Sequence, residues 1–512
     1  MTETIMQPVP AHSHRPDVSF DGGDLDCGNG LLLLIRKHID PMQKGQLLEI
    51  RSTEISVDED LPAWCRTTRN ELVSWTISDR QRSFLVCKGL VSERMAAPAE
   101  PALRPHSHGH AHGPAVAARA KRRATPAPAI RPLSVMGIGS WPRPRWMLSA
   151  MHEHSSGRLA EGQFQETADD AVRLAIAAQN RAGVDVITDG EQRRDSYASF
   201  VAGRLDNCQL IPLTDLLPLV DDPEEFEQEL RALDVPAADV RHPALFGRIS
   251  RSQPLVAHEV DFARSLTDLP VKVALPGPYL LTRTMWMECI RERAYDSREA
   301  LAADIVRVLR EEVAETLDAG ASLIQFDEPV LTDVVFTGAK AKPSFMCGAL
   351  SESRGPEIEL GFARELVNAV IAGFPRERMA LHVCRGNWTP DETVALAGDY
   401  RPLVDTLAGM HVGAYLLEMC TPRAGEMEIL KRLPGDAMIG VGVVNQKHDE
   451  TEALDFVTAK IRDAVNAFGQ ERVLLHPDCG FATFADNPIC GAGGAESKLA
   501  VIAKAARDIR GG

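Results

Sequence analysis

The feature that most constrains this chain is a regular alternation of short apolar runs and longer helical segments over residues 133–512. The eight runs are VMGIG (135–139), DVITDG (185–190), VKVALPG (271–277), LIQFDE (323–328), ALHVC (380–384), YLLEM (415–419), MIGVGVV (438–444) and VLLHPD (473–478). The intervening segments, such as SREALAADIVRVLREEVAETLDAG, place apolar residues at helical spacing and end in glycine. Strand and helix alternating eight times predict an α/β fold, a (β/α)8 TIM barrel. The stretch 193–270 is too long for one helix and predicts an added element between the second and third strands.

A segment of different composition separates this region from the N-terminus. Residues 92–132 are rich in alanine and proline, contain almost no large apolar side chains and follow neither a helical nor a strand period, so they cannot bury a core. They predict a disordered linker between a unit over 1–91 and the barrel over 133–512. Four linker histidines alternate with small residues, namely His106, His108, His110 and His112. Such a tract either binds a transition metal loosely or only keeps a tether solvated.

Composition and charge exclude several classes of protein. The 56 basic and 72 acidic residues give a net charge of −16, which disfavours a general nucleic-acid binder. A membrane-spanning helix needs about 18 apolar residues, and no apolar run in this sequence approaches that length. The N-terminus has no apolar signal core. Ten cysteines in 512 residues are too few and too scattered for a disulfide scaffold. We therefore expect a soluble, cytoplasmic protein without nucleic-acid or membrane partners.

Polar, acidic and thiol side chains gather where the predicted strands end. Barrel enzymes carry their chemistry at the carboxyl ends of the strands. In this sequence those positions hold Ser140, Glu191, Asp327, Glu328, His382, Cys384, Glu418, Asn445 and Cys479. Their concentration predicts an active site at that end of the barrel.

Four of these residues have the character of a metal site. His382 and Cys384 are two positions apart on one strand, so both side chains point to the same face. Cys479 ends the eighth strand and Glu418 lies late in the sixth, so both can reach the same mouth of the barrel. One histidine, two cysteines and a carboxylate form a tetrahedral set suited to Zn2+, the cofactor that we predict. With both thiols ionised, such a zinc would bind an incoming thiol as a reactive thiolate rather than activate water.

The order of the motifs gives this region a family resemblance. From Leu133 to Arg510 it resembles the catalytic C-terminal half of cobalamin-independent methionine synthase. The resemblance rests on IGSWPRP (138–144), DGEQRRDSY (189–197), LPGPYLLT (275–282), QFDEPVL (325–331), HVCRGNW (382–388), LLEMC (416–420) and HPDCGF (476–481). It implies a methyltransferase in which the zinc-bound thiolate of homocysteine attacks a methyl group in line, giving methionine. The family's zinc ligands fall on the four residues proposed above, His382, Cys384, Glu418 and Cys479.

The resemblance also assigns substrate residues. In the family the IGS segment and the acid of the DGE motif help to hold the amino-acid substrate, which implies Ile138, Ser140 and Glu191 here. Asp327 of the DEP motif would bind the substrate ammonium and so count among the catalytic residues, a role that suits a buried carboxylate at a strand end. The alternative for the segment Asp327–Pro329 is a loop cap.

Three departures separate this sequence from the family pattern. The second, barrel-like half that helps to bind the folate tail has no counterpart. The family histidine that protonates the leaving group aligns with Lys447, and His448 is adjacent, so both are candidate catalytic residues. The Arg-Gly-Asn after Cys384 resembles short relatives with other donors and thiols, including alkyl transferases that use coenzyme M. We therefore expect as partners a homocysteine-like thiol and a methyl donor, either a methylfolate or a methyl-corrinoid.

The N-terminal unit resembles the TusA-type (SirA-like) sulfur carriers over residues 20–88. Its helix-like run LLLLIRKHI, strand-like LLEIRS, the segment DEDLPAWCRTTRNELVSW and the strand SFLVCK predict a small α+β two-layer sandwich. In that family a cysteine at the start of the first helix carries a persulfide, and Cys27 matches it. The family's Cys-Pro-x-Pro is Cys-Gly-Asn-Gly over residues 27–30 here. Cys27 is therefore either a sulfur carrier that meets a relay protein or a structural or docking residue.

Three functions remain open at this point. The first is a zinc-dependent thiol methyltransferase of the methionine synthase type, fused to a sulfur carrier. The second keeps the zinc but uses another thiol or a methyl-corrinoid donor. In the third the barrel is inactive, and the protein is a sulfur-relay or regulatory module that acts through Cys27. The intact set of four metal ligands argues against the third.

Overall fold

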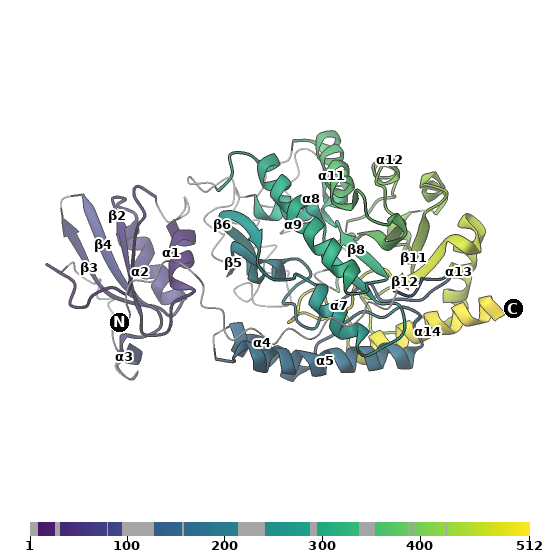
Figure 1. Cartoon of the computed structure of the whole chain (residues 1–512), viewed down its shortest axis with the longest axis horizontal. Helices are drawn as coiled ribbons and strands as arrows, with labels where there is room; N and C mark the ends of the chain where they lie inside the picture. Colours follow the sequence, from purple (N-terminus) through teal and green to yellow (C-terminus); the bar gives the residue numbers. More distant parts are fainter. Residues whose placement is uncertain are drawn as a thin grey trace. The chain divides into compact units, whose positions relative to one another are not determined.

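The computed structural model describes residues 9–25, 31–78, 80–94, 127–155, 158–212, 241–286, 294–336, 354–387, 390–392, 396–425 and 427–511. These residues belong to two compact units, each of which is described by itself (Figure 1). Cys27 lies outside the described residues, as do the linker histidines His106, His108, His110 and His112.

The N-terminal unit is built on a four-stranded sheet. Its strands are β1 (Val18–Asp21), β2 (Leu47–Ser52), β3 (Glu71–Ser78) and β4 (Gln81–Cys87), and they lie in the order β1-β2-β4-β3. β1 pairs with β2 in parallel, whereas β4 pairs antiparallel with both β2 and β3. The helices are α1 (Leu32–Ile39), α2 (Val57–Thr67) and the short α3 (Val91–Arg94). α1, β2 and β4 lie where the sequence predicts a helix and two strands.

A period of two along β2 separates the faces of this sheet. Leu48 and Ile50 belong to the core that the sheet shares with α1 and α2, where Ile35 and Leu61 are fully buried. Leu47 points to the opposite face and belongs to a smaller cluster. The strand therefore contributes apolar side chains to both faces of the sheet, and α1 and α2 cover the face with the larger core.

The helix α3 reaches into the segment predicted as linker. Val91 packs against the smaller cluster of the sheet, and Arg94 pairs with Asp17 at 2.5 Å. At the other end of that segment, Ile130 packs against a cluster of the C-terminal unit. Both ends of the segment 92–132 therefore carry defined contacts, each with its own unit.

The C-terminal unit contains a six-stranded parallel sheet. Its strands are β7 (Lys272–Pro276), β8 (Leu323–Asp327), β9 (Met379–Val383), β10 (Ala414–Leu417), β11 (Met438–Val444) and β12 (Val473–Pro477), hydrogen-bonded in chain order. Each matches one of the predicted strands. Every residue of β7, β8, β9 and β12 is buried, which explains why these strands read as continuous apolar runs.

The two remaining predicted strands are short bridges rather than full strands. Val135 pairs in parallel with β12, and Met136 pairs in parallel with Val186. Ile187 pairs in parallel with Val271, next to the start of β7. These bridges therefore link the two edges of the six-stranded sheet.

Helices alternate with these strands, so the unit is a mixed α/β fold with a parallel sheet (Figure 1). The longer helices are α5 (Glu161–Ala182), α9 (Arg298–Asp318), α11 (Pro356–Ile371), α13 (Leu454–Phe468) and α14 (Ala492–Gly511). The shorter ones are α4 (Arg145–Ser155), α7 (Ala257–Arg264), α8 (Pro278–Met285), α10 (Val330–Phe336) and α12 (Val404–Ala408). α5 ends where Gly183 adopts a left-handed φ of 78°, which glycine reaches without strain. Among the helices of the described ranges, none has the length and apolar character needed to span a membrane.

An antiparallel hairpin interrupts the alternation between residues 193 and 270. β5 (Leu205–Pro212) pairs with β6 (Arg241–Arg251), and α7 follows before β7 begins. This hairpin lies where the sequence predicts an added element between the second and third strands.

Candidate functional site

A cavity opens at the carboxyl ends of the parallel strands. It is lined by Ile138, Ser140, Glu191, Tyr197, Asp327, Pro329, His382, Cys384, Asn387, Cys479, Gly480, Thr483 and Phe484. The list includes all four predicted substrate residues and three of the four predicted metal ligands. Residues that are far apart in the sequence therefore meet in one place, as the strand-end argument predicts.

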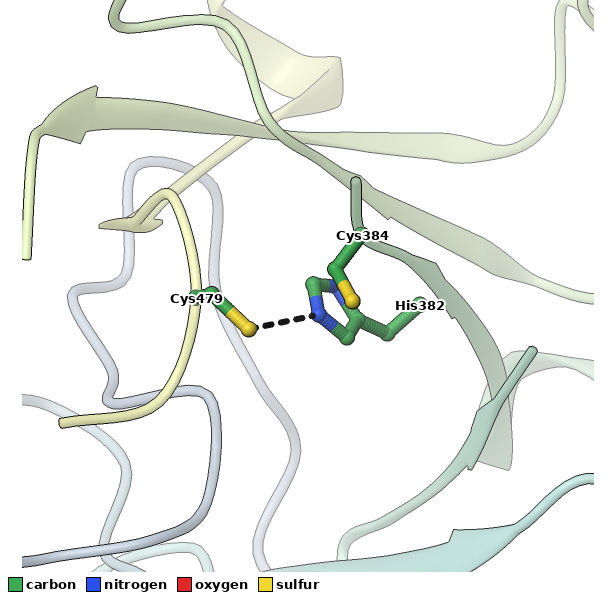
Figure 2. Close-up of side chains that lie close together, drawn as sticks. All are labelled: His382, Cys384 and Cys479. Atoms are coloured by element: carbon green, nitrogen blue, oxygen red, sulfur yellow. Dashed lines mark hydrogen bonds between the residues drawn. The ribbon is translucent and has the colours of Figure 1, made fainter. Parts of the chain in front are cut away.

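Three of the predicted metal ligands form a compact group (Figure 2). His382 lies on β9, Cys384 follows that strand directly, and Cys479 follows β12. One donor atom from each lies within 4.8 Å of the others, and His382 Nε2 is 3.6 Å from Cys479 Sγ. The other ring nitrogen, Nδ1, is 3.0 Å from the carbonyl oxygen of Leu416. A proton on Nδ1 would satisfy that carbonyl and leave the lone pair of Nε2 directed at the two sulfurs.

Burial favours the neutral forms of His382 and Cys479. It lowers the pKa of His382 to about 3, so the imidazole is uncharged at neutral pH. Hydrogen bonding with Cys384 and burial raise the pKa of Cys479 well above its usual range. A divalent cation would reverse that second effect, because a coordinating thiol loses its proton.

Glu418 stands next to this group but is not part of it. It follows β10, is 1% exposed, and its Oε1 accepts a hydrogen bond from the backbone N–H of Arg385 at 3.0 Å. Its Oε2 lies 3.5 Å from an Nη of Arg423 and accepts no hydrogen bond from the described residues. Burial raises the pKa of Glu418, with both arginines opposing the shift. A buried carboxylate oxygen without a hydrogen-bond donor, beside two thiols and an imidazole, fits a cation.

Glu191 is held in an unusual backbone conformation at the other end of the cavity. Its φ is 55°, in the left-handed region that residues with side chains seldom adopt. The backbone N–H donates to Oδ1 of Asp189 at 2.9 Å, and the carbonyl oxygen accepts from Nη2 of Arg143 at 2.6 Å. A Cβ on Gly139 would lie 2.0 Å from Oε1 of Glu191, so the glycine of the IGS segment makes room for this carboxylate. Such a residue is a signature of a functional site.

Arg143 ties together the loops that carry the site residues. The same Nη2 also donates to the carbonyl oxygen of Arg194 at 2.6 Å, and Nη1 donates to that of Ala482 at 3.3 Å. The first two bonds reach the loop of Glu191, and the third reaches the loop that follows Cys479. The sequence offered a signal for this role, since Arg143 stands in the same motif as Ser140.

The two acids of the DEP motif have different roles. Asp327 lines the cavity, and burial together with the nearby Glu191 raises its pKa to about 7. Glu328 is fully buried, and its two oxygens accept the backbone N–H groups of Tyr279 and Leu280 at 2.8 and 2.9 Å. Glu328 therefore caps the first turn of α8, whereas Asp327 faces the cavity, and its contact with a substrate ammonium stays a prediction.

The two candidates for the proton-transfer residue lie in different environments. The side chain of Lys447 is buried, and burial lowers its pKa while Glu418 and both cysteines of the metal group raise it. His448 is 58% exposed, and its Nε2 lies 3.0 Å from Oε1 of Glu392. Of these two residues, Lys447 is therefore the one whose charge acts on Glu418 and the two cysteines.

Sequence reasoning missed the polar residues that connect the loops on the other side of the cavity. Nδ2 of Asn387 donates to the carbonyl oxygen of Gly480 and to Oγ1 of Thr483, both at 2.7 Å. Its Oδ1 accepts from Nε2 of Gln446 at 2.7 Å, and Oε1 of Gln446 accepts the backbone N–H of Cys479 at 3.2 Å. The Arg-Gly-Asn after Cys384 could have signalled Asn387, because its asparagine is the residue that anchors the loop of Cys479.

Comparison with known proteins finds a family model and named relatives that match most of the C-terminal unit. Residues 133–215 and 228–492 match the family model described as "Cobalamin-independent synthase, Catalytic domain". Methionine synthases of Saccharolobus solfataricus and Sulfolobus acidocaldarius are each 26% identical over 344 residues, which cover 67% of this chain and 86% and 84% of those proteins.

Two solved structures share the fold. A B12-independent methionine synthase from Shewanella sp. W3-18-1 superposes with a TM-score of 0.56 at 21% identity, over 75% of this chain and 98% of that one. A protein from Listeria monocytogenes, described as a putative vitamin-B12-independent methionine synthase, gives 0.53 at 19% identity, over 75% and 99%.

Fold, site and family matches together define an enzyme of the methyltransferase class. Within that class, the chain belongs to the family of cobalamin-independent methionine synthase catalytic domains.

Proposed function

We propose that this protein catalyses zinc-dependent transfer of a methyl group to the sulfur of homocysteine, giving methionine. The observation that carries the proposal is the pairing of two kinds of group in one cavity. The His382, Cys384 and Cys479 donors suit a thiol-binding metal, and the carboxylates of Glu191 and Asp327 suit an ammonium. Homocysteine carries both a thiol and an ammonium.

The residues present fit zinc. His382, Cys384 and Cys479 supply soft and borderline donors, and Oε2 of Glu418 is a buried oxygen that accepts no hydrogen bond from the described residues. We assign these four as the ligands. When bound there, zinc would lower the pKa of the acceptor thiol and so supply a thiolate at neutral pH.

The chain's own residues then align the reactants. Asp327 and Glu191 would hold the ammonium of the substrate, with Ile138 and Ser140 along its backbone end, so that the sulfur reaches the metal end of the cavity. The sulfur–carbon bond forms as the bond between the methyl group and its donor breaks. Buried walls keep water away from the nucleophile. We propose that Lys447, rather than the exposed His448, gives a proton to the leaving group of the donor.

Glu191 and Asp327 form what we call the acidic end of the cavity, and the grouped donors form its metal end. The charge of the acidic end bears on the identity of the thiol. Coenzyme M carries a sulfonate in place of an ammonium, and a sulfonate beside Glu191 and Asp327 would bring like charges together in a buried site. We therefore favour homocysteine. For the donor, we propose a methylfolate, and a methyl-corrinoid is the alternative that the assay below separates.

We propose further that the three parallel bridges and the six-stranded sheet form a closed (β/α)8 barrel. We also propose that the N-terminal unit is a TusA-like sandwich with Cys27 as sulfur carrier and a relay protein as partner. The cytoplasmic location stays a prediction. Mass spectrometry of the intact protein, before and after a thiol reductant, would test Cys27. An extra sulfur atom that is lost on reduction, and is absent from Cys27→Ser, is the expected result; a wild-type mass that does not change on reduction contradicts it.

The decisive experiment is methionine formation by the zinc-loaded protein, with methyltetrahydrofolate or methylcobalamin as donor. Cys384→Ala is the control. Methionine from one donor, absent with the control, establishes the reaction and names the donor. If the zinc-loaded protein methylates coenzyme M but not homocysteine, the assignment of the acceptor is wrong.

A further inference from the structure

A buried lysine with no part in the proposed reaction lies beneath the acidic end of the cavity. Lys272 begins β7 and is 1% exposed. Its Nζ donates to the carbonyl oxygen of Ile138 and to Oε1 of Gln325, both at 2.5 Å. The other end of the same amide, Nε2 of Gln325, donates to Oδ1 of Asp327 at 2.6 Å. Lys272 therefore contacts Ile138, a predicted substrate-binding residue, directly, and it is linked through Gln325 to Asp327, the carboxylate proposed to bind the ammonium.

The polarity of these groups gives the chain of hydrogen bonds one direction. An ammonium can only donate, an ionised carboxylate can only accept, and a carboxamide has one donor end and one acceptor end. When Lys272 and Asp327 are both ionised, Lys272 needs Oε1 on its side and Asp327 needs Nε2 on its side, so a single orientation of Gln325 satisfies both. In the strand register Lys272 lies opposite Leu323, which shares its face of β8 with Gln325 and Asp327.

This hydrogen bond fixes the orientation of the Asp327 carboxylate. With Oδ1 held by Gln325, the carboxylate cannot turn freely, and its remaining lone pairs stay available to the cavity that Asp327 lines. Without Lys272, Gln325 could rotate and place its carbonyl oxygen against Asp327. The carboxylate would then lose the hydrogen bond from Gln325, and it would gain a repulsive neighbour.

We propose that Lys272 and Gln325 are positioning residues that orient the carboxylate of Asp327 toward a substrate ammonium and so select amino-acid thiols over thiols that lack the amine. This inference rests on the proposed function. It extends that function, because it assigns the selectivity to two residues beneath the cavity, and Lys272 does not itself touch substrate.

The test compares homocysteine with its analogue without the amine, 4-mercaptobutanoate, on the zinc-loaded full chain. Lys272→Met removes the ammonium at nearly constant length, and Gln325→Glu keeps an acceptor for Lys272 but removes the donor to Asp327. Each variant is expected to raise KM for homocysteine about tenfold or more, since a hydrogen bond to a charged group is lost. KM for 4-mercaptobutanoate and the zinc content should stay close to those of the wild type.

A matched control removes another buried cation of the same unit. Arg298 is 2% exposed and pairs with Glu359 at 2.9 Å, and neither residue lines the cavity. Arg298→Met should lower the melting temperature without changing the ratio of the two KM values.

Two outcomes would overturn the inference. One is an unchanged KM ratio in Gln325→Glu, which decides the matter alone if Lys272→Met does not fold. The other is an equal loss for both thiols or a loss of zinc, either of which would make these residues merely structural. A wild-type protein without any preference for homocysteine would instead refute the proposed function.

Discussion

The two ends of the cavity are both buried and both have a carboxylate near an arginine, but they differ in the other side chains that gather there. At the acidic end, the chain supplies its own cations: Arg194 lies 3.9 Å from Glu191, and Arg143 holds the carbonyl oxygen of that residue. At the metal end, Arg423 also lies 3.5 Å from Glu418, but the side chains grouped there are the neutral His382 and two thiols. The acidic end therefore offers oxygen acceptors with arginines beside them, whereas the metal end offers the nitrogen and sulfur donors that suit a metal cation.

The largest effect is expected from removing a donor at the metal end. Cys479→Ser should lose most of the bound zinc, because a serine hydroxyl is a poor replacement for a thiolate. Methyl transfer should then fall by about a thousandfold or more, as metal binding contributes several kcal/mol to the barrier. Elemental analysis and a methionine assay measure the two quantities.

Cys490→Ser is the matched control for that variant. Cys490 is equally buried and lies outside the three-residue group. The Cys490→Ser variant should bind as much zinc as the wild type. Full retention of zinc by Cys479→Ser would remove Cys479 from the ligands and erase the contrast between the two ends.

The second largest effect is expected from removing the charge of Asp327 at the acidic end. Asp327→Asn keeps the shape of the side chain but removes its charge, so KM for homocysteine should rise by roughly 10- to 100-fold. Zinc content should not change, because Asp327 is not among the grouped donors. A parallel fall in zinc would show that the two ends are not independent.

A third prediction concerns pH and uses methionine, whose thioether does not titrate. Burial raises the pKa of Asp327 to about 7, so the ionised form that pairs with an ammonium is present above that pH and is lost as the pH falls. The affinity of the zinc-loaded protein for methionine should therefore drop up to about tenfold per pH unit below 7. Calorimetry from pH 5.5 to 8.5 measures this, and Asp327→Asn should bind weakly with a flat profile. A flat profile in the wild type would contradict the assignment.

The smallest effect is expected from the residue that joins the loops of both ends. Arg143→Met removes three hydrogen bonds to backbone carbonyl groups, at Glu191, Arg194 and Ala482. We expect the free energy of unfolding to fall by about 2–3 kcal/mol, because buried acceptors lose their donor. KM should rise only a few-fold, since the carboxylates themselves remain. Chemical denaturation and steady-state kinetics test this; an effect on KM as large as that of Asp327→Asn would give Arg143 a direct role in binding.

Much of this site could be predicted from local sequence, wherever the residues concerned lie on one strand or helix. His382 and Cys384 share a face because a strand has a period of two, and the structure places both in the grouped donors. Six apolar runs became strands within two residues of their predicted limits, because buried parallel strands need continuous apolar sequence. The first two runs became bridges only, since nothing in a short apolar run fixes how many of its residues pair.

Other features required the tertiary structure. Glu418 was expected to join the donors on equal terms, yet its position relative to Cys479 depends on the arginines that hold its carboxylate. The choice between the buried Lys447 and the exposed His448 depends on the path of one loop, which adjacent sequence positions do not encode.

The sequence by itself determined the chemistry that is available: the donor types, the acids at the strand ends and the strand order that brings them to one edge. Only the tertiary structure decided how these groups are oriented. The left-handed Glu191, the loop-joining Arg143 and the polar chain from Lys272 through Gln325 to Asp327 all depend on contacts between residues far apart in the sequence. Local patterns report which face a side chain occupies, but they do not report which distant hydrogen-bonding group meets it there.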